Sequence, residues 1–202
     1  MGILGFCLNR DLCHARQRAS FLVLFVVCTS PAFLRAQQKA ADSPAPPEII
    51  ATDDGLLALT TPKGWIRADG AGAAYFVPEA SGQNPRVCIY IASAPISSKA
   101  GAKDLQTYIE SDISNFNSKY KNAIVRREQP LELPQMQLRA SVITFRSGEK
   151  TNSFEQVIYI PDVGRVWTLV LSAKEEPLFT SSLAVFHEFA QSYRGTISVS
   201  PD

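Results

Sequence analysis

The chain has 202 residues, of which 46% are hydrophobic and 19% charged, a length and composition that suit one domain with an apolar core. Lys and Arg number 20 and Asp and Glu number 19, a near-neutral balance that argues against a nucleic-acid binder driven by counterion release. The 13 Pro and 11 Gly exclude collagen and a low-complexity chain. We therefore expect a single globular domain, a monomer, with no nucleic-acid partner.

Residues 1–36 have the three parts of a secretory signal peptide. Basic residues (Arg10, Arg16 and Arg18) precede an apolar run over 21–28, and small residues follow it. A transmembrane helix needs about 20 apolar residues, and the stretch over 20–34 is shorter and contains a Pro. We predict a cleaved signal and a periplasmic or secreted protein. The alternative is an uncleaved segment that anchors the protein in a membrane.

Cleavage is predicted after Ala32 or after Ala36, where small residues stand near the end of the signal. Removal of 1–36 leaves a net charge of −2 and Cys88 as the single cysteine. An exported protein with one cysteine has no internal disulfide, so its fold must depend on its apolar core.

After the signal, residues 37–47 (QQKAADSPAPP) are Ala, Pro and polar residues, which predicts a flexible linker before a domain over 48–202. Short apolar runs between turn signals predict strands at 56–60, 75–77, 87–94, 123–127, 137–146, 154–160 and 165–172. Pro161-Asp162-Val163-Gly164 is predicted to form a hairpin turn between the last two strands.

Two amphipathic helices complete the predicted elements. Apolar residues recur at helical spacing at Leu105, Tyr108, Ile109, Ile113, Phe116 and Tyr120, and again at Leu178, Leu183, Phe186, Phe189 and Tyr193. Asp104 is expected to cap the first helix, and the second is expected over about 177–192.

The last two predicted strands, 154–160 and 165–172, are apolar on both faces. A sheet that is apolar on both faces must be covered on both. We therefore predict an α+β domain, with a mainly antiparallel β-sheet flanked by helices on both faces.

The order of motifs along the chain supports this fold. Pro62-Lys63-Gly64-Trp65 follows the first strand, and RVWTLVLSA over 165–173 leads into a Phe-rich helix that ends at Ser192-Tyr193. Over 48–195 this layout resembles the Mog1/PsbP-like superfamily. The resemblance implies an α/β/α sandwich and an accessory or binding protein without a shared active site, so it transfers no functional residues. Trp65 is expected to close one end of the sandwich.

The side chains that commonly carry catalysis are few. His187 lies beside the apolar face of the last helix, where it suits a hydrogen bond to a backbone carbonyl or water better than a role as base or metal ligand. Cys88 lies within an apolar strand, which is typical of a buried small residue rather than a nucleophile. We predict no catalytic, cofactor-binding or metal-binding residues.

The charged and Gly-rich patterns are weak as functional signals. Gly70-Ala71-Gly72 precedes a strand instead of opening a helix, so we interpret it as a turn and not a dinucleotide loop. A modest basic stretch (Lys119, Lys121, Arg126 and Arg127) suits a solvated face, with docking to an anionic partner as the alternative.

These observations predict a non-catalytic accessory or binding protein, with an unknown protein or small-molecule partner and no cofactor. Two alternatives remain open. One is a hydrolase-type enzyme whose site is assembled by folding and includes His187 or Cys88, and the other is a membrane-tethered structural protein of the cell envelope.

Overall fold

A computed structural model describes residues 47–52, 55–69, 74–82, 84–96, 102–148 and 153–197. The predicted signal peptide over 1–36 and all but the last residue of the predicted linker over 37–47 lie outside the described residues. None of the helices in the described part of the chain combines the length and apolar character that a membrane span needs.

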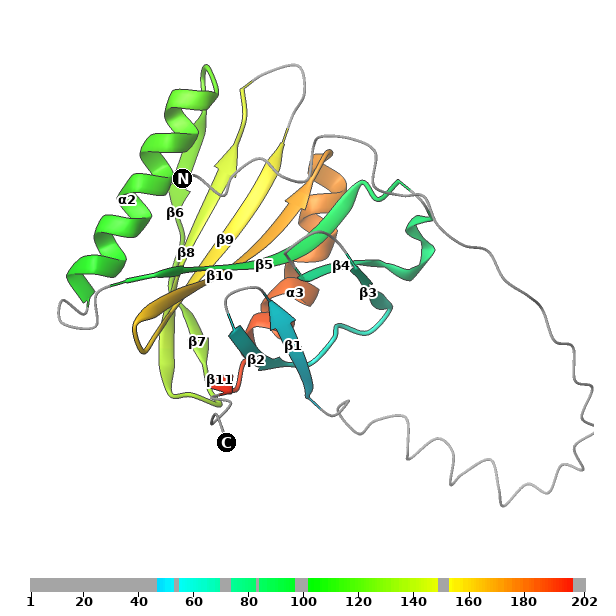
Figure 1. Cartoon of the computed structure of the whole chain (residues 1–202). Helices are drawn as coiled ribbons and strands as arrows, with labels where there is room; N and C mark the ends of the chain where they lie inside the picture. Colours follow the sequence, from blue (N-terminus) through cyan, green and yellow to red (C-terminus); the bar gives the residue numbers. More distant parts are fainter. Residues whose placement is uncertain are drawn as a thin grey trace, which may run out of the picture.

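The described part of the chain begins with short strands and ends with a helix and one more strand (Figure 1). In chain order the elements are β1 (Glu48–Thr52), β2 (Gly55–Leu59), β3 (Trp65–Asp69), β4 (Ala74–Pro78), the short 3-10 helix η2 (Glu79–Ser81), β5 (Val87–Pro95), α2 (Ala102–Lys119), β6 (Ile124–Arg127), β7 (Leu131–Leu133), β8 (Leu138–Arg146), β9 (Phe154–Asp162), β10 (Arg165–Ala173), α3 (Glu176–Gln191) and β11 (Thr196–Ile197).

The strands form one large sheet and one small sheet. The eight-stranded sheet has the order β3-β4-β5-β10-β9-β8-β6, with β7 also paired to β8, and the three-stranded sheet has the order β1-β2-β11. Every strand pair in the described part of the chain is antiparallel. The prediction of an α+β fold with a mainly antiparallel sheet is therefore confirmed.

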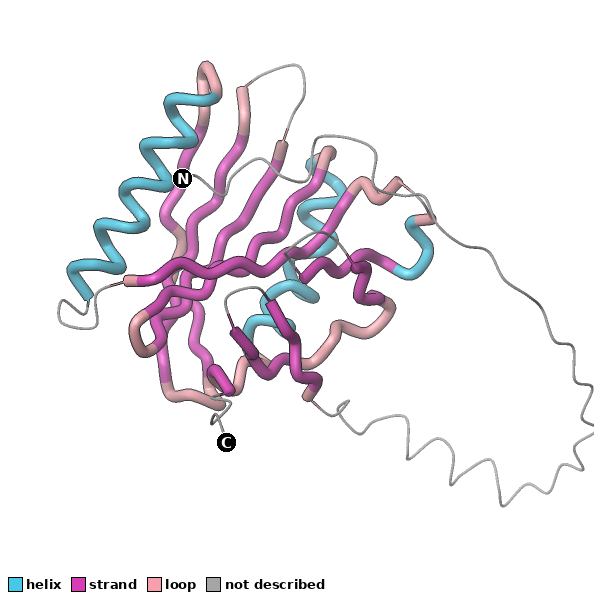
Figure 2. The backbone as a smooth tube through the Cα atoms, viewed as in Figure 1, coloured by secondary structure: helices cyan, strands magenta, loops and turns pink. Residues whose placement is uncertain are grey.

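Alternate residues of the long strands enter two separate apolar clusters. In β10, Trp167 and Leu169 pack in one cluster and Val166 and Val170 in the other. Because side chains alternate across a strand, the two clusters lie on opposite faces of the sheet. The first cluster also contains residues of α3, and the second contains residues of α2. The two helices, cyan in Figure 2, lie apart from each other with strands between them. We call these two sides the α3 face and the α2 face.

Most predicted elements occur within a residue or two of the expected positions, and three details differ. The helix α2 begins at Ala102, so Asp104 lies in its first turn and is not its cap. The strand β9 continues through Pro161 and Asp162, so the hairpin turn is only Val163-Gly164, with Gly164 at φ +72°. Four short strands (β1, β3, β7 and β11) were not predicted.

Trp65 lies in β3, is half-buried, and packs against the cluster of the α3 face. Its neighbours in the motif Pro62-Lys63-Gly64-Trp65 make a tight turn, in which the Trp65 N–H donates to the Pro62 carbonyl. Gly64 has φ +76°, a left-handed conformation that favours glycine. The motif thus has a structural role in turning the chain into β3.

Candidate functional site

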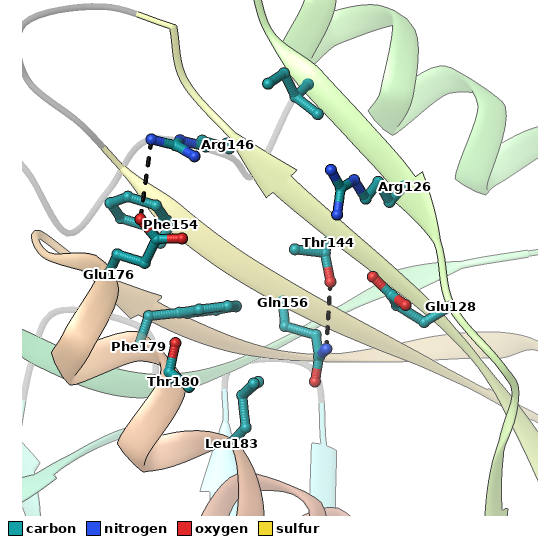
Figure 3. Close-up of a pocket in the computed structure, with 11 residues that line it drawn as sticks. Arg126, Glu128, Thr144, Arg146, Phe154, Gln156, Glu176, Phe179, Thr180 and Leu183 are labelled. Carbon is teal, nitrogen blue, oxygen red and sulfur yellow. Dashed lines mark hydrogen bonds and ion pairs between the residues drawn. The ribbon is translucent and has the colours of Figure 1, made fainter.

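A groove of about 360 Å³ lies on the α3 face, between the first half of α3 and strands β6, β8 and β9 (Figure 3). Its lining residues are Ile124, Arg126, Glu128, Thr144, Arg146, Phe154, Gln156, Glu176, Phe179, Thr180 and Leu183. A second cavity beside Cys88 has a volume of only about 20 Å³, about enough for one water molecule. The larger groove is therefore the candidate site.

The strand register explains why these residues meet. Across β6, β8 and β9, Ile124 is paired with Arg146, which is paired with Phe154. Two residues along, Arg126 is paired with Thr144, which is paired with Gln156. Residues paired across adjacent antiparallel strands point to the same face, so each set forms a row on the α3 face.

The position of α3 leaves these rows open. The helix lies closest to β10, β9, β7 and β5, nearer the centre of the sheet than its β6 edge. The strand β6 and the adjoining part of β8 therefore lie to one side of α3 on this face. The open edge and the side of α3 form the two walls of the groove.

One part of the groove is apolar. Phe154 of β9 and Phe179 of α3 are buried, with their ring centroids 6.0 Å apart. Leu183, one turn further along α3, is half-buried beside them, and Ile124 at the sheet edge is 46% exposed. These side chains offer an apolar surface to a ligand. Covering that surface is favourable roughly in proportion to the apolar area removed from water.

Arg146 closes the apolar end of the groove. Its guanidinium carbon lies 5.0 Å from the centroid of the Phe154 ring, within the range of a cation–π interaction. One of its nitrogens lies 4.0 Å from Oε2 of Glu176, in the first turn of α3. The charges of Arg146 and Glu176 therefore already compensate each other within the protein.

Arg126 and Glu128 line the groove at the sheet edge and are both exposed. They are two residues apart on one extended segment, because the Glu128 N–H donates to the Val142 carbonyl and continues the pairing of β6 with β8. Neither side chain forms an ion pair or a hydrogen bond with another residue in the described part of the chain. The groove thus presents one positive and one negative group, side by side.

A chain of hydrogen bonds crosses the floor of the groove. Gln156, which is buried, donates from Nε2 to Oγ1 of Thr144 at 3.3 Å. Its Oε1 lies 2.7 Å from Nε2 of His187 on α3, so the histidine nitrogen must donate. Since the Thr144 oxygen accepts from Gln156, the Thr144 O–H remains able to donate to a ligand.

His187 therefore has a different partner from the one expected. We predicted a half-buried position with a bond to a backbone carbonyl or water, and the position is confirmed, whereas the partner is the Gln156 side chain. Burial lowers the pKa of His187 below its ordinary value. The ring is therefore neutral at pH 7, and the tautomer with hydrogen on Nε2 fits the contact.

Cys88 does not belong to the same site as His187. It is buried in β5 on the α2 face, whereas its neighbours Val87 and Ile89 pack in the cluster of the α3 face with residues of α3. The large sheet therefore separates Cys88 from His187. A hydrolase site that joins these two side chains is excluded by this arrangement, and the prediction that Cys88 is a buried strand residue is confirmed.

The residues of the predicted basic stretch also lie on opposite faces of the sheet. Arg127 forms an ion pair with Glu110 of α2, and Arg126 points into the groove on the other face. Lys119 lies over the Tyr120 ring, 5.1 Å from its centroid. The stretch is therefore not one basic patch, because neighbouring residues of β6 point to opposite faces.

No group of three potential metal ligands from His, Cys, Asp and Glu occurs among the described residues. Of the groove residues, Arg126 belongs to the basic stretch singled out in the sequence, whereas Thr144, Gln156 and Arg146 were not predicted. The signal available for them was a polar residue at every second position of one strand (Thr144 and Arg146), on the face where the preceding alternate residues, Ala140 and Val142, are apolar.

No protein-family model and no curated protein matches this chain. The solved structures similar to it include cyanobacterial PsbP (CyanoP) from Synechocystis sp. PCC 6803, at 16% identity and a TM-score of 0.48, covering 76% of this chain and 95% of that one. They also include a point mutant of the protein Mog1, at 12% identity and a TM-score of 0.43, covering 72% of this chain and 87% of that one. The superfamily that the motif layout over 48–195 resembles is named after these same two proteins.

Proposed function

We propose that this protein is a non-catalytic accessory protein that binds a partly apolar ligand in the groove between α3 and the β6 edge of the sheet. The observation that carries the proposal is the groove itself, about 360 Å³ in volume, with apolar and charged walls. Ligand sites are typically concave, largely apolar surfaces with a few polar groups that fix orientation.

The chemistry of the lining supports binding rather than catalysis. A nucleophile needs a base within hydrogen-bond reach, but the Thr144 hydroxyl is bonded to Gln156, and His187 uses its Nε2–H on the same amide. The side chains that face the groove can hold and orient a ligand. They offer charge, hydrogen bonds and apolar contact, which are the requirements of a binding protein.

The place where the protein works is part of the same proposal. The leader pattern over 1–36 supports export, and we propose a periplasmic or secreted protein with a helix on each face of one sheet. Its alternative, a membrane-tethered protein, differs in whether residues 1–36 remain on the isolated chain.

Native mass spectrometry of the protein purified from its own source, without refolding, tests the proposal. We expect the mass of a chain that begins at Phe33 or Gln37, together with an additional mass from retained ligand. Thr180 lines the groove, so Thr180→Trp is expected to fill it and abolish the retained mass.

Ser181→Trp is the matched control, because Ser181 is the next residue of α3, is exposed, and does not line the groove. The control should keep the retained mass. A retained mass that persists in Thr180→Trp, or a bare protein in every preparation, would contradict a tightly held ligand in this groove. A full-length mass would support the tethered alternative.

A further inference from the structure

We propose that the ligand of the groove is a small zwitterion with an apolar body, of the class of apolar α-amino acids, with its carboxylate at Arg126 and its ammonium at Glu128. This inference rests on the proposed function of the groove. It deepens that proposal by assigning the ligand chemistry and the two residues that recognise it.

The charge arrangement favours a zwitterion over a simple ion. Arg126 and Glu128 lie on one extended segment, line the same groove, and have no ion-pair partner among the described residues. A ligand with only a carboxylate would place it near Glu128 as well as Arg126, and a ligand with only an ammonium would meet Arg126. Like charges in close contact oppose binding, so only a ligand with both charges suits both residues.

The spacing of the two residues also fits. Residues two apart on a strand are separated by about 7 Å along it. The ammonium and carboxylate of an α-amino acid are about 3 Å apart, and a charge-assisted hydrogen bond is about 2.8 Å long. The 7 Å is the backbone separation, and both side chains are long enough for their charged ends to reach the two ends of a zwitterion of this size.

A third polar contact comes from Thr144, which is paired with Arg126 across the strands. Its hydroxyl accepts from Gln156, so its proton is directed to another acceptor, and a ligand carboxylate beside Arg126 provides one. The chain from His187 through Gln156 holds the hydroxyl in place from beneath. We assign Thr144 as a second carboxylate-binding residue.

The apolar body of the ligand would lie toward α3. Phe179 and Leu183 stand on the helix across the groove from the charged edge, with Phe154 in the sheet beside them (Figure 3). Arg146 and Glu176 form an ion pair at that end, so no uncompensated charge lies beside the apolar wall. The polar and apolar halves of the groove therefore match the two halves of an apolar amino acid.

Isothermal titration calorimetry of the isolated protein tests this with four probes of similar shape. They are L-leucine, L-phenylalanine, leucinamide, which lacks the carboxylate, and 4-methylpentanoate, which lacks the ammonium. We expect leucine or phenylalanine to bind, and both leucinamide and 4-methylpentanoate to bind at least about tenfold more weakly than leucine, because each loses a charge-assisted contact.

Two variants assign the contacts. In Arg126→Gln, leucine should lose its advantage over leucinamide, and in Glu128→Gln it should lose its advantage over 4-methylpentanoate. Arg127→Gln is the control, because Arg127 is the neighbouring residue, faces α2, and pairs with Glu110. This control should retain both preferences of the unmodified protein.

The outcomes separate this inference from the proposed function. The zwitterion proposal would be overturned if 4-methylpentanoate or leucinamide bound as tightly as leucine, or if no amino acid bound. In either case, a mass retained in Ser181→Trp but not in Thr180→Trp would still support the groove as a binding site. If the four probes fail to bind and Thr180→Trp keeps the same retained mass as Ser181→Trp, both proposals are wrong.

Discussion

The two faces of the large sheet differ in the hydrogen bonds that they provide to carboxyl groups, of which Asp162 is half-buried and Glu155 is buried. Alternate residues of one strand, β9, supply both cases: Asp162 points to the α3 face and Glu155 to the α2 face. The difference between them depends on which donors the surrounding elements provide.

On the α3 face, Asp162 has several donors. Its Oδ2 accepts hydrogen bonds from the Tyr193 hydroxyl at 2.8 Å and from the Thr196 hydroxyl, and its Oδ1 accepts from the Val163 N–H at 2.7 Å. Burial alone would raise the pKa of Asp162, but these hydrogen bonds outweigh it and lower the pKa below its ordinary value. The network also connects the C-terminal strand β11 to the β9–β10 hairpin.

On the α2 face, carboxyl groups have few donors. Asp112 of α2 is buried and accepts one hydrogen bond, from the Tyr159 hydroxyl at 3.2 Å. Glu155 accepts at Oε1 from Ser153 at 3.1 Å and Ser172 at 3.5 Å, and its Oε2 is buried without a partner. Burial raises the pKa of both carboxyl groups above their ordinary values.

Two hydroxyl groups on the α2 face are in a similar position. The Tyr108 and Thr168 hydroxyls are buried and form no well-aligned hydrogen bond. Burial and the neighbouring Asp112 raise the pKa of Tyr108 to about 12. The two faces therefore differ in the satisfaction of their polar groups, and the α2 face carries the larger desolvation cost.

The largest effect is expected from the apolar packing of the α3 face. Phe186 of α3 is fully buried, so Phe186→Ala should lower the free energy of unfolding by about 3–5 kcal/mol, through lost transfer energy and the cavity left behind. Urea denaturation followed by tryptophan fluorescence measures this. A loss below about 1 kcal/mol would show that α3 is not an essential cover of this face.

A smaller effect is expected at the satisfied carboxylate. Tyr193→Phe removes one donor to Asp162 and should cost about 1.5–3 kcal/mol, the range for a hydrogen bond to a charged group. Tyr120→Phe is the control, because the half-buried Tyr120 hydroxyl forms no hydrogen bond within the described residues. Equal losses in the two variants, by the same denaturation measurement, would contradict the role of the network.

The two faces should also respond oppositely to pH. A carboxyl whose pKa is raised by folding contributes stability that is full below its unfolded pKa, about 4, and is lost as the pH rises through its folded pKa. For Asp162, whose pKa is lowered, stability is instead lost as the pH falls through the folded pKa.

Asp112→Asn and Glu155→Gln should therefore each reduce the loss of stability as the pH rises above about 4, and Asp162→Asn should reduce the loss at acidic pH. Urea midpoints measured from pH 3 to pH 9 compare the loss of stability at acidic pH with the loss at higher pH. A profile for Asp112→Asn and Glu155→Gln that parallels the unmodified protein would mean that neither carboxyl keeps its proton longer in the folded state.

The smallest effect is expected at the surface. Arg127→Gln removes the ion pair with Glu110, in which both side chains are about half exposed, and should change the free energy of unfolding by at most about 1 kcal/mol. A larger loss would mean that this pair is needed to hold α2 on the sheet, and it would make the α2 face more dependent on charge than its packing indicates.

Much of the fold follows from local patterns. The helix α3 and the strands β5, β8, β9 and β10 have long apolar runs or a clear helical period, and each was predicted within two residues of its bounds. The strands β1, β3, β7 and β11 have only two to five residues each, too few for a clear alternating pattern. The strands β1, β3 and β7 pair with the next strand along the chain, and β11 pairs with the distant β2, which local sequence does not indicate.

The candidate site was predicted only in fragments. The sequence pointed to Arg126 as part of a basic stretch and to His187 as a half-buried residue, but it did not bring them together. The row from Arg126 through Thr144 to Gln156 exists because strands β6, β8 and β9 pair in one register. A shift of one residue would turn Thr144 to the other face.

The sequence by itself determined the long strands, the helices and their apolar faces, because these depend on residues close together along the chain, and its composition determined the scarcity of His and Cys. The tertiary structure alone decided which polar residues share a face, which carboxyl groups receive donors, and where α3 leaves the sheet uncovered. Those outcomes depend on strand register and helix placement, which are set by the summed packing of residues far apart in the sequence.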